Sequence, residues 1–526
     1  MEPRKKLAAT IAPFLMFSLL LAGCGLSGGD ETPPMEQGAI PTNTVIAPPP
    51  VEQTTQPIEQ ETEPPETSPE ASLMTYKIVD TGQAYCYNDT VSIPCPEAGS
   101  PAFGQDAQYA GNPPGYTDNG DGTITDLNTG LMWVKDPGAK STYDQAVAGT
   151  TTFNLAGHND WRLPTIKELY SLINFSGYDP SDCESEAGCP GLVPFIDPNS
   201  FTFQYGKPES GERLIDSQFI SSTPYAGKGV EGGLVFGVNF ADGRVKGYPT
   251  GDNTFFVRYV SGAPGYGTAQ LVDNGDGTLT DQASGLTWMQ TDSQQALNWG
   301  DALAYCENLA WAGQEDWRLP NAKELYSIVD TSRGPDVSNT AATNSLFQST
   351  PITNEAGAPD YGYYWTSTTH LNRQLAASEA VYIAFGRALG YIDGAWTDIQ
   401  GAGAQRSDPK TGDPAGFPQG RGPQGDAVRI LNYARCVRGG VSDQVLTGGE
   451  VDQKATAVLN APLPTVQFTP SASSEEPPPE AYKACTGKKA NTACQYEWIF
   501  GTQDGVCNEF FGQLVCMPGV VLPTLP

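Results

Sequence analysis

The sequence predicts two tandem domains that mix helices and strands, because one stretch of the chain occurs twice. Residues 160–171 read DWRLPTIKELYS, and residues 316–327 read DWRLPNAKELYS. In the first copy Thr165 and Glu168 form the capping box of a helix N-terminus, and Asn321 replaces the threonine in the second. Apolar residues follow at helical spacing. Each stretch therefore predicts the start of an amphipathic helix docked on a core, which explains it better than a catalytic site does.

The repeat extends well beyond this helix start. Each copy opens with Asp-Asn-Gly-Asp-Gly-Thr, which predicts a strand, a turn and a second strand. A helix follows, and the second half predicts further strands. The corresponding segments are 118–126 and 273–281, 143–146 and 299–302, 219–223 and 364–368, and 240–248 and 385–391. Since each copy of about 150 residues can enclose its own core, we expect two similar domains, at 117–262 and 271–440.

The N-terminus looks like a bacterial lipoprotein signal. Basic residues at 4–6 precede an apolar run that ends in Leu-Ala-Gly-Cys, the lipobox pattern, at Cys24. The run is too short for a spanning helix. The resemblance implies removal of residues 1–23, lipidation of Cys24 and an extracytoplasmic protein at the outer membrane or cell surface. The alternative is an ordinary secretory signal that ends near a cysteine.

Four further segments flank the two domains. Residues 24–75 are rich in Pro, Thr and Glu and predict a disordered tether. Residues 76–116 predict a disulfide-stapled lead-in packed on the first domain. Residues 441–482 predict a polar linker. Residues 483–518 hold four cysteines in a module too small for its own apolar core, so disulfides must stabilise it.

The charge of the chain restricts its partners. There are 29 Lys and Arg against 60 Asp and Glu, which gives a formal net charge of −31. We expect no nucleic-acid partner, because nucleic-acid binding needs a concentrated basic face. Sulfated polysaccharide is disfavoured for the same reason, unless charge is locally segregated.

The chain has eleven cysteines, and ten remain for disulfides once Cys24 is assigned to the lipid. Proximity in the sequence and comparison of the two copies predict the pairs Cys86–Cys95, Cys183–Cys189 and Cys306–Cys436. The last pair follows because the first copy lacks counterparts of both residues, and it has Tyr259 where the second has Cys436. Closing a loop of about 130 residues stabilises by roughly 4–5 kcal/mol, so we expect the first copy to be less stable.

The last four cysteines, Cys485, Cys494, Cys507 and Cys516, can pair with one another in three ways. The sequence does not choose among them.

The paired openings, the Gly-Leu-x-Trp strands and the two DWRLP…KEL stretches resemble the Lcl C-terminal domain family, named after a collagen-like surface adhesin. The resemblance implies an α+β, C-type-lectin-like fold in which two helices flank a twisted antiparallel sheet. It also implies ligand binding by the loops after the second helix, and a remote relation to formylglycine-generating enzymes. It carries no residue-level binding site to this chain.

The sequence shows no catalytic or metal-binding motif. The only histidines are His158 and His370, no Cys/His spacing suits zinc, and no nucleophile elbow, Walker loop or dinucleotide fingerprint appears. The turn that begins at Asp118 fails the EF-hand pattern, because Gly120 and Gly122 stand where acids are needed. We therefore expect no enzyme activity, no metal and no cofactor; calcium at these turns is possible but not favoured.

Aromatic and basic residues of the second copy are the candidate ligand-binding residues: Tyr364, Arg387, Tyr391, Trp396 and Arg421. Trp396 and Arg421 lie in the glycine- and proline-rich stretch 392–426, and a loop of this length is usually functional or disordered. Aromatic faces beside polar groups suit a saccharide or a protein. Tyr364 could instead be a core strand residue.

These observations predict a lipid-anchored protein of the cell envelope that binds a glycan, or an envelope or host protein, without catalysis. The main alternative is a structural subunit that docks another envelope protein. Two further hypotheses are a variable binding scaffold and a relative of the formylglycine-generating oxidases.

Overall fold

The computed structural model describes residues 75–189, 191–227, 233–373, 376–442, 444–452, 479–489, 492–498, 501–510 and 513–518. The predicted signal peptide, Cys24, nearly all of the predicted tether and positions 453–478 of the predicted linker lie outside these residues. Among the helices described, none has the length and apolar character needed to cross a membrane.

The two repeated stretches form short helices with the predicted caps. Helix α2 spans Ile166–Ser171 and helix α4 spans Ala322–Ser327. The backbone N–H of Glu168 donates to Thr165 Oγ1 at 3.2 Å, and the N–H of Thr165 donates to Glu168 Oε2 at 2.8 Å. The predicted helix start is thus confirmed, but each helix ends after six residues, before part of its predicted apolar face.

An arginine in each stretch fixes the capping glutamate. Arg162 makes two parallel bonds to Glu168, each 2.7 Å long, and Arg318 makes two of 2.6 Å to Glu324. Bidentate pairs of this kind orient both side chains, so the arginine is part of the helix cap. In the second copy both partners are buried.

The repeated openings form matching antiparallel sheets of four strands. In the first copy these are β3 (Tyr116–Asp118), β4 (Thr123–Asp126), β5 (Met132–Val134) and β11 (Val260–Ser261), and in the second β12 (Leu271–Asp273), β13 (Thr278–Asp281), β14 (Thr287–Met289) and β22 (Val437–Arg438). In the first turn the N–H of Gly120 donates to Asp118 Oδ1, and Thr123 donates to Asp121 Oδ1 from its N–H and its hydroxyl. Turn chemistry therefore uses the acidic oxygens of this segment.

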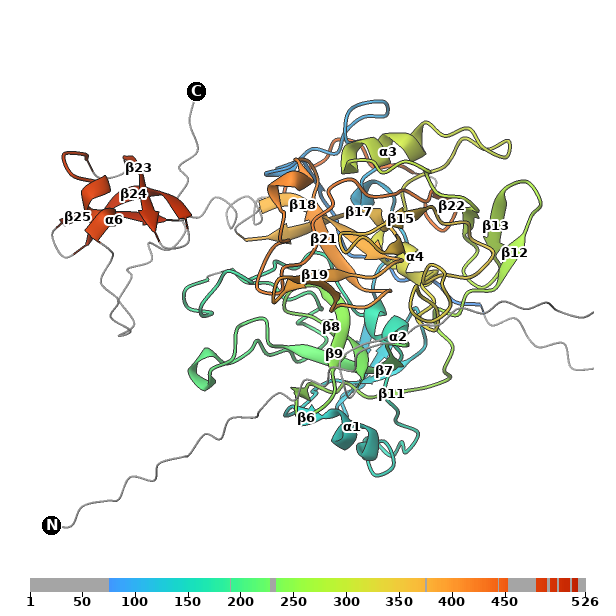
Figure 1. Ribbon diagram of the computed structural model, residues 1–526. Coiled ribbons are helices and arrows are strands. Elements are labelled where there is room, and N and C mark those ends of the chain that lie inside the picture. Colours follow the sequence, from blue (N-terminus) through green and yellow to red (C-terminus); the bar gives the residue numbers. More distant parts are fainter. Residues whose placement is uncertain are drawn as a thin grey trace, which may run out of the picture. The chain divides into compact units, whose positions relative to one another are not determined.

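The second halves of the two copies join in one six-stranded antiparallel sheet (Figure 1). Its order is β17 (Tyr363–Asn372), β18 (Ala376–Ala384), β21 (Gln405–Pro409), β9 (Arg244–Pro249), β8 (Leu234–Asn239) and β7 (Gln218–Pro224). The copies meet where Gln405 of β21 pairs with Val245 of β9.

The predicted match between 240–248 and 385–391 does not hold in this sheet. The place beside β18 that corresponds to β9 is taken by β21. The segment after Phe385 instead forms a separate hairpin of β19 (Leu389–Ile392) and β20 (Ala395–Asp398). The second copy therefore carries an inserted hairpin, which the similar Gly-Arg pairs in the two segments concealed.

Alternating side chains of the central sheet enter different cores. Val381 and Ile383 of β18 belong to a cluster that also contains α2 and α4 and draws on both copies, whereas Tyr382 faces a cluster of the second copy alone. A third cluster belongs to the first copy and contains Trp161. Each copy therefore has a core of its own, as expected, but a third core is shared between the two copies, which was not predicted.

The repeated stretches also bind each other. The Lys167 ammonium donates to the carbonyl oxygen of Ser327, the last residue of α4, at 2.7 Å, and Lys323 donates to that of Ser171, the last residue of α2, at 2.8 Å. Each lysine donates to one further carbonyl, on Gly267 or Asp80 respectively. Burial lowers the pKa of both lysines to about 8. An uncharged amine keeps two N–H donors, so both carbonyls stay satisfied in either charge state.

Aromatic packing completes this contact. The rings of Tyr170 and Tyr326 lie 4.4 Å apart between α2 and α4. The Lys and Tyr of the repeated stretch thus connect the copies, while its Trp, Arg and Glu build each copy separately.

The remaining helices and short strands are distributed between the copies. In the first copy β6 (Ser141–Thr142) pairs with β10 (Thr254–Phe255) and leads into α1 (Tyr143–Gly149). In the second copy α3 (Trp299–Glu307) packs against β17, and β15 (Pro351–Thr353) pairs with β16 (Pro359–Tyr361). Three 3₁₀ turns are η1 (Asp106–Gln108), η2 (Pro208–Ser210) and η3 (Pro414–Gly416).

The lead-in contains β1 (Cys86–Tyr87) and β2 (Ser92–Ile93). We expected it to pack on the first copy, but it also packs on the second. The amide of Gln83 bonds both the N–H and the carbonyl of Thr369 in β17 of the second copy, at 2.9 and 2.8 Å. The start of the predicted linker is also ordered against it, since Cys95 and Gly448 exchange two backbone hydrogen bonds. The lead-in is thus bound to β17 of the second copy and to the start of the linker, and it also accepts a backbone hydrogen bond from Phe175 of the first copy.

The structure contains the three predicted disulfides, Cys86–Cys95, Cys183–Cys189 and Cys306–Cys436. Cys306 lies in α3 and Cys436 immediately precedes β22, so the bond ties the first helix of the second copy to its last strand. In the first copy the Tyr259 hydroxyl donates to the carbonyl of Ala146 in α1 at 2.7 Å. A Cβ at Gly149 would collide with that hydroxyl. A hydrogen bond thus stands where the other copy has a covalent bond.

The C-terminal module has one of the three possible connectivities, Cys485–Cys507 and Cys494–Cys516. It consists of α6 (Pro479–Ala484), β23 (Ala493–Trp498), β24 (Gly501–Phe510) and β25 (Gln513–Pro518), and its strands form a three-stranded antiparallel sheet. The cysteines make up most of its buried cluster, as a module without its own apolar core requires.

We predict that Asp106→Asn reduces the pH dependence of stability. The carboxylate accepts bonds from Thr81 and Thr368 at 2.8 and 2.5 Å. Burial, and then the charge of Asp80, raises its pKa from 3.8 to about 8. Unfolding therefore releases a proton between these values, and this group's contribution to stability is lost as the pH rises through them. Asparagine removes that loss, of up to about 1.4 kcal/mol per pH unit.

Urea unfolding of both proteins at about pH 5 and about pH 8 measures this difference. The matched control is the exposed Asp144→Asn, which should keep the wild-type pH dependence. An Asp106→Asn protein with the wild-type pH dependence would contradict the assignment.

Candidate functional site

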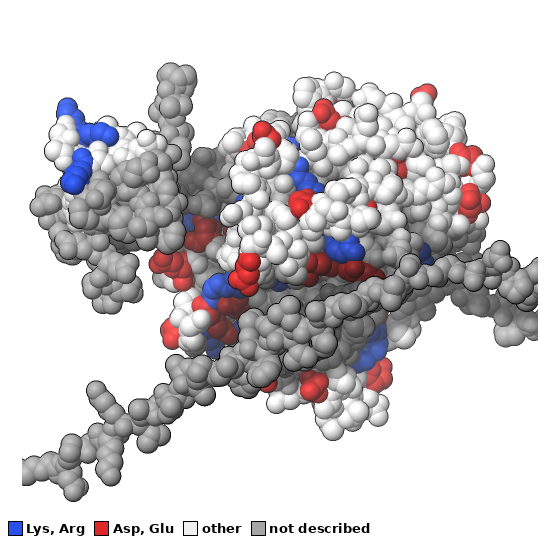
Figure 2. Space-filling model, in the orientation of Figure 1, with Lys and Arg blue, Asp and Glu red and all other residues white. Residues whose placement is uncertain are grey.

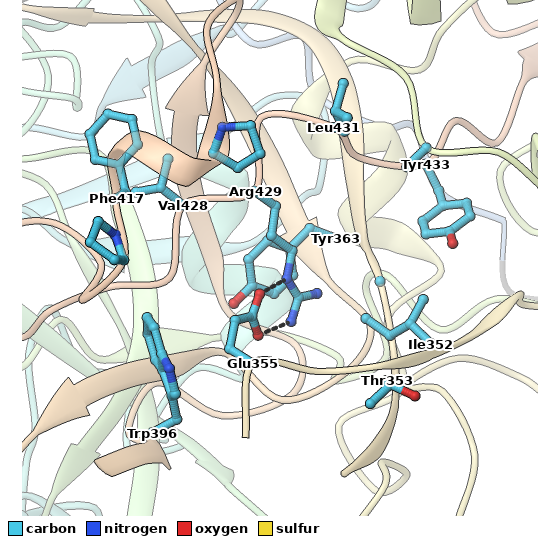
Figure 3. A pocket seen from close by; sticks show the side chains of 14 residues that line it. Ile352, Thr353, Glu355, Tyr363, Trp396, Phe417, Val428, Arg429, Leu431 and Tyr433 are labelled. Atoms are coloured by element: carbon cyan, nitrogen blue, oxygen red, sulfur yellow. Dashed lines mark hydrogen bonds and ion pairs between the residues drawn. The ribbon is translucent and has the colours of Figure 1, made fainter. Parts of the chain in front are cut away.

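A groove lined mainly by apolar and aromatic side chains lies in the second copy (Figure 3). Its volume is about 490 Å³, and its lining comes from several segments of the second copy. These are Ala296, the hairpin β15–β16 with the adjoining start of β17, the hairpin β19–β20, and the chain from η3 to Tyr433. The groove therefore lies where the inserted hairpin meets the glycine-rich stretch.

A stacked pair and an ion pair form the floor of this groove. The guanidinium carbon of Arg429 lies 3.7 Å from the ring centroid of Tyr363, and Tyr363 stacks on Tyr382 at 4.4 Å. The guanidinium also makes two bonds to Glu355, from Nε at 2.8 Å and from Nη2 at 2.9 Å. Figure 3 shows these two bonds among the residues that line the groove. The floor thus presents a stacked guanidinium beside a fixed carboxylate, and the ring of Tyr363 is covered on both faces.

The ion pair is electrostatically stable. Burial alone would raise the pKa of Glu355, but hydrogen bonds and the charge of Arg429 lower it overall. Burial alone would lower the pKa of Arg429, but Tyr363 and Glu355 raise it overall. Both groups therefore stay charged around neutral pH, and they can accept and donate hydrogen bonds to a ligand.

Trp396 and Phe417 form a wall of the groove (Figure 3). The register of β19–β20 places Trp396 opposite Tyr391, whose ring packs edge-on at 5.2 Å. Both residues are only partly buried. A tryptophan held by a neighbouring ring but open to solvent can contact a ligand without reorganisation.

The five predicted ligand-binding residues do not form one site. Trp396 lines the groove, and Tyr391 supports it from outside. Arg387 holds Asp336 through bonds of 2.6 and 3.0 Å, and Arg421 forms an ion pair with Glu379 in a different cavity.

The assignment of Tyr364 to ligand binding is wrong. Its side chain is fully buried in the shared core, and its hydroxyl donates to Asp292 at 2.5 Å. The alternative of a core strand residue is the correct one. Its neighbour Tyr363 points to the other face of β17 and reaches the groove, as the alternation of side chains along a strand requires.

Sequence reasoning missed Glu355 and Arg429. They are 74 residues apart, and Arg429 lies after the glycine-rich stretch 392–426 in which Trp396 and Arg421 were predicted to bind a ligand. No local sequence pattern predicts an ion pair between a charged residue in one hairpin and a charged residue in a distant loop.

The two histidines occupy structural positions. His158 lies in a turn closed by backbone bonds to Leu155. His370 is fully buried, stacks on Phe195 and lies 3.4 Å from Asp179. Neither reaches the groove.

Comparison with known proteins places both copies in one family. Residues 122–261 and 277–397 match the Lcl C-terminal domain. No curated protein and no solved structure matches the chain. The second match ends in β20, before β21 and the disulfide-bonded Cys436. The chain thus carries two copies of the Lcl C-terminal domain in tandem.

Proposed function

We propose that this protein binds a glycan without catalysis, in the groove of its second copy. One observation carries the proposal: the groove combines the exposed face of Trp396 with the fixed Glu355–Arg429 pair on its floor. We further infer a C-type-lectin-like arrangement in each copy, as the family resemblance implies.

The chemistry of this groove suits a sugar ring. A pyranose presents C–H groups on its faces and hydroxyl groups at its edge. Trp396 and Phe417 offer apolar faces for the former, and the charged pair accepts and donates hydrogen bonds with the latter. A volume of about 490 Å³ is in the usual range for small-ligand sites.

A protein partner is the second candidate. Ile392 and Leu431 are 40% and 46% exposed, and they belong to the same hairpin and loop as the groove. Apolar side chains around an aromatic pocket also suit the centre of a protein interface. A docked envelope or host protein would cover them, whereas a short glycan would leave them in water.

A glycan array with the full-length purified protein tests the first candidate. We expect selective binding that Trp396→Ala weakens at least about tenfold, because a buried aromatic contact is lost. The matched control is Trp311→Ala, which removes a tryptophan that is 39% exposed and does not line the groove. Repeating the array with calcium and with chelator tests the turns at Asp118 and Asp273.

Two outcomes oppose the glycan proposal. An array without selective binding in either condition would favour the protein partner. Binding that survives Trp396→Ala but is lost in Trp311→Ala would move the site away from the groove.

We also propose that Cys24 carries a lipid that anchors the protein to the envelope. The support is the basic start, the short apolar run and the Leu-Ala-Gly-Cys sequence. Cells grown with a labelled fatty acid should label the wild-type protein and leave Cys24→Ala unlabelled. Label that persists in Cys24→Ala would contradict the anchor.

A further inference from the structure

A second cavity lies at the junction of the two copies and differs from the aromatic groove in chemistry. Its volume is about 300 Å³, and charged residues of both copies line it, including Arg244 and Lys246 of β9 and Arg406 of β21. Neither copy alone would contain it. On the face that Figure 2 displays, acidic and basic residues gather in a band across the middle of the molecule.

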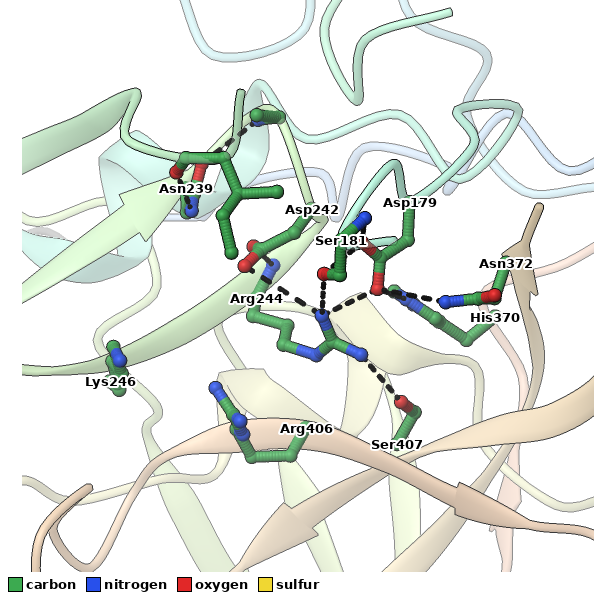
Figure 4. A network of polar contacts seen from close by, with 12 residues as sticks. Asp179, Ser181, Asn239, Asp242, Arg244, Lys246, His370, Asn372, Arg406 and Ser407 are labelled. Carbon is green, nitrogen blue, oxygen red and sulfur yellow. Dashed lines mark hydrogen bonds and ion pairs between the residues drawn. The ribbon is translucent and has the colours of Figure 1, made fainter. Parts of the chain in front are cut away.

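The register of the central sheet brings three cations together. Because Gln405 pairs with Val245 in an antiparallel ladder, Arg406 lies opposite Arg244, and Lys246 lies on the same face of the sheet. Figure 4 shows the three side chains around one space. Like charges opposite each other across a ladder are destabilising, so their placement calls for an explanation.

Ion pairs with carboxylates explain why the arginines can lie close together. The pairs are Arg244 with Asp179 at 2.5 Å, Arg406 with Asp426, and Arg421 with Glu379. Asp242 also lines the cavity and lies 3.7 Å from Arg244, and burial raises its pKa. Each of these carboxylates thus forms an ion pair with an arginine.

Lys246 is the exception. Its ammonium donates to the amide oxygen of Gln424 at 2.6 Å, and it forms no ion pair with any carboxylate in the described part of the chain. Burial, and then the charge of Arg406, lowers the pKa of Lys246 to about 8. The charges of Asp426 and Asp242 act in the opposite direction, but neither carboxylate is close enough to form an ion pair with the ammonium. A buried ammonium without a direct ion pair, close to a guanidinium, favours an anion.

We propose that this cavity binds a small oxyanion, a carboxylate or a phosphate, between Lys246 and Arg406. The ammonium supplies a point charge, and the guanidinium supplies planar N–H donors that suit either oxyanion. The site is independent of the aromatic groove.

Isothermal titration and thermal unfolding of the full-length protein with inorganic phosphate and with glucuronate test this proposal. Glucose and chloride at matched ionic strength are the ligand controls. We expect saturable binding and a raised melting temperature with at least one oxyanion. Binding of phosphate but not glucuronate, or of glucuronate but not phosphate, would identify the type of oxyanion.

The decisive variant is Lys246→Met, with the exposed Lys77→Met as a control of equal charge change. We expect Lys246→Met to weaken oxyanion binding at least about tenfold. Without ligand it should melt at the wild-type temperature or higher, because a like-charge contact is removed. Lys77→Met should bind as the wild type does.

Three results would overturn the proposal. One is a wild-type protein that responds to phosphate and glucuronate only as it does to chloride. The second is Lys246→Met with undiminished binding. The third is a lower melting temperature of Lys246→Met without ligand, which would give the lysine a structural role.

Discussion

The contact between the two repeated helix starts is the interaction on which the rest of the structure depends. Lys167 and Lys323 each place an ammonium on the last carbonyl of the opposite helix, where the helix dipole is negative. The bond from Lys323 to Ser171 is buried, so removing this lysine would leave a carbonyl group without a partner in the protein interior. It fixes α2 against α4, and these helices in turn cover one face of the sheet that both copies build. The duplication therefore produced one compact unit.

That unit positions two cavities of opposite character. The aromatic groove belongs to the second copy and depends on the hairpin β19–β20, an insertion that the first copy lacks. The charged cavity depends on the junction of β9 with β21 and so on the presence of both copies. Divergence of one copy and association of the two are thus separate sources of binding surface in the same chain.

The sequence predicted what depends on local chemistry. The capping boxes at Thr165 and Asn321 and the Cys306–Cys436 bond follow from neighbouring residues or from comparison of the copies. Trp396, one of the five residues predicted to bind a ligand, lines the groove, but Glu355 and Arg429 on the groove's floor were not predicted. Contacts that join distant segments were missed, since a lysine bound to a backbone carbonyl leaves no trace in the partner's sequence. For the same reason the sequence did not predict that β21, and not the segment 385–391, pairs with β18.

Native-state hydrogen exchange on the full-length protein tests most directly whether the copies form one folding unit. We predict that the amides of β8 and β18 share one free energy of opening, and that Lys323→Met lowers both by the same amount. The opposite result would be earlier opening of β8, in the copy without an internal disulfide between its helix and last strand, while β18 stays protected. In that case the copies would be independent domains, and the charged cavity would not be a permanent feature of the molecule.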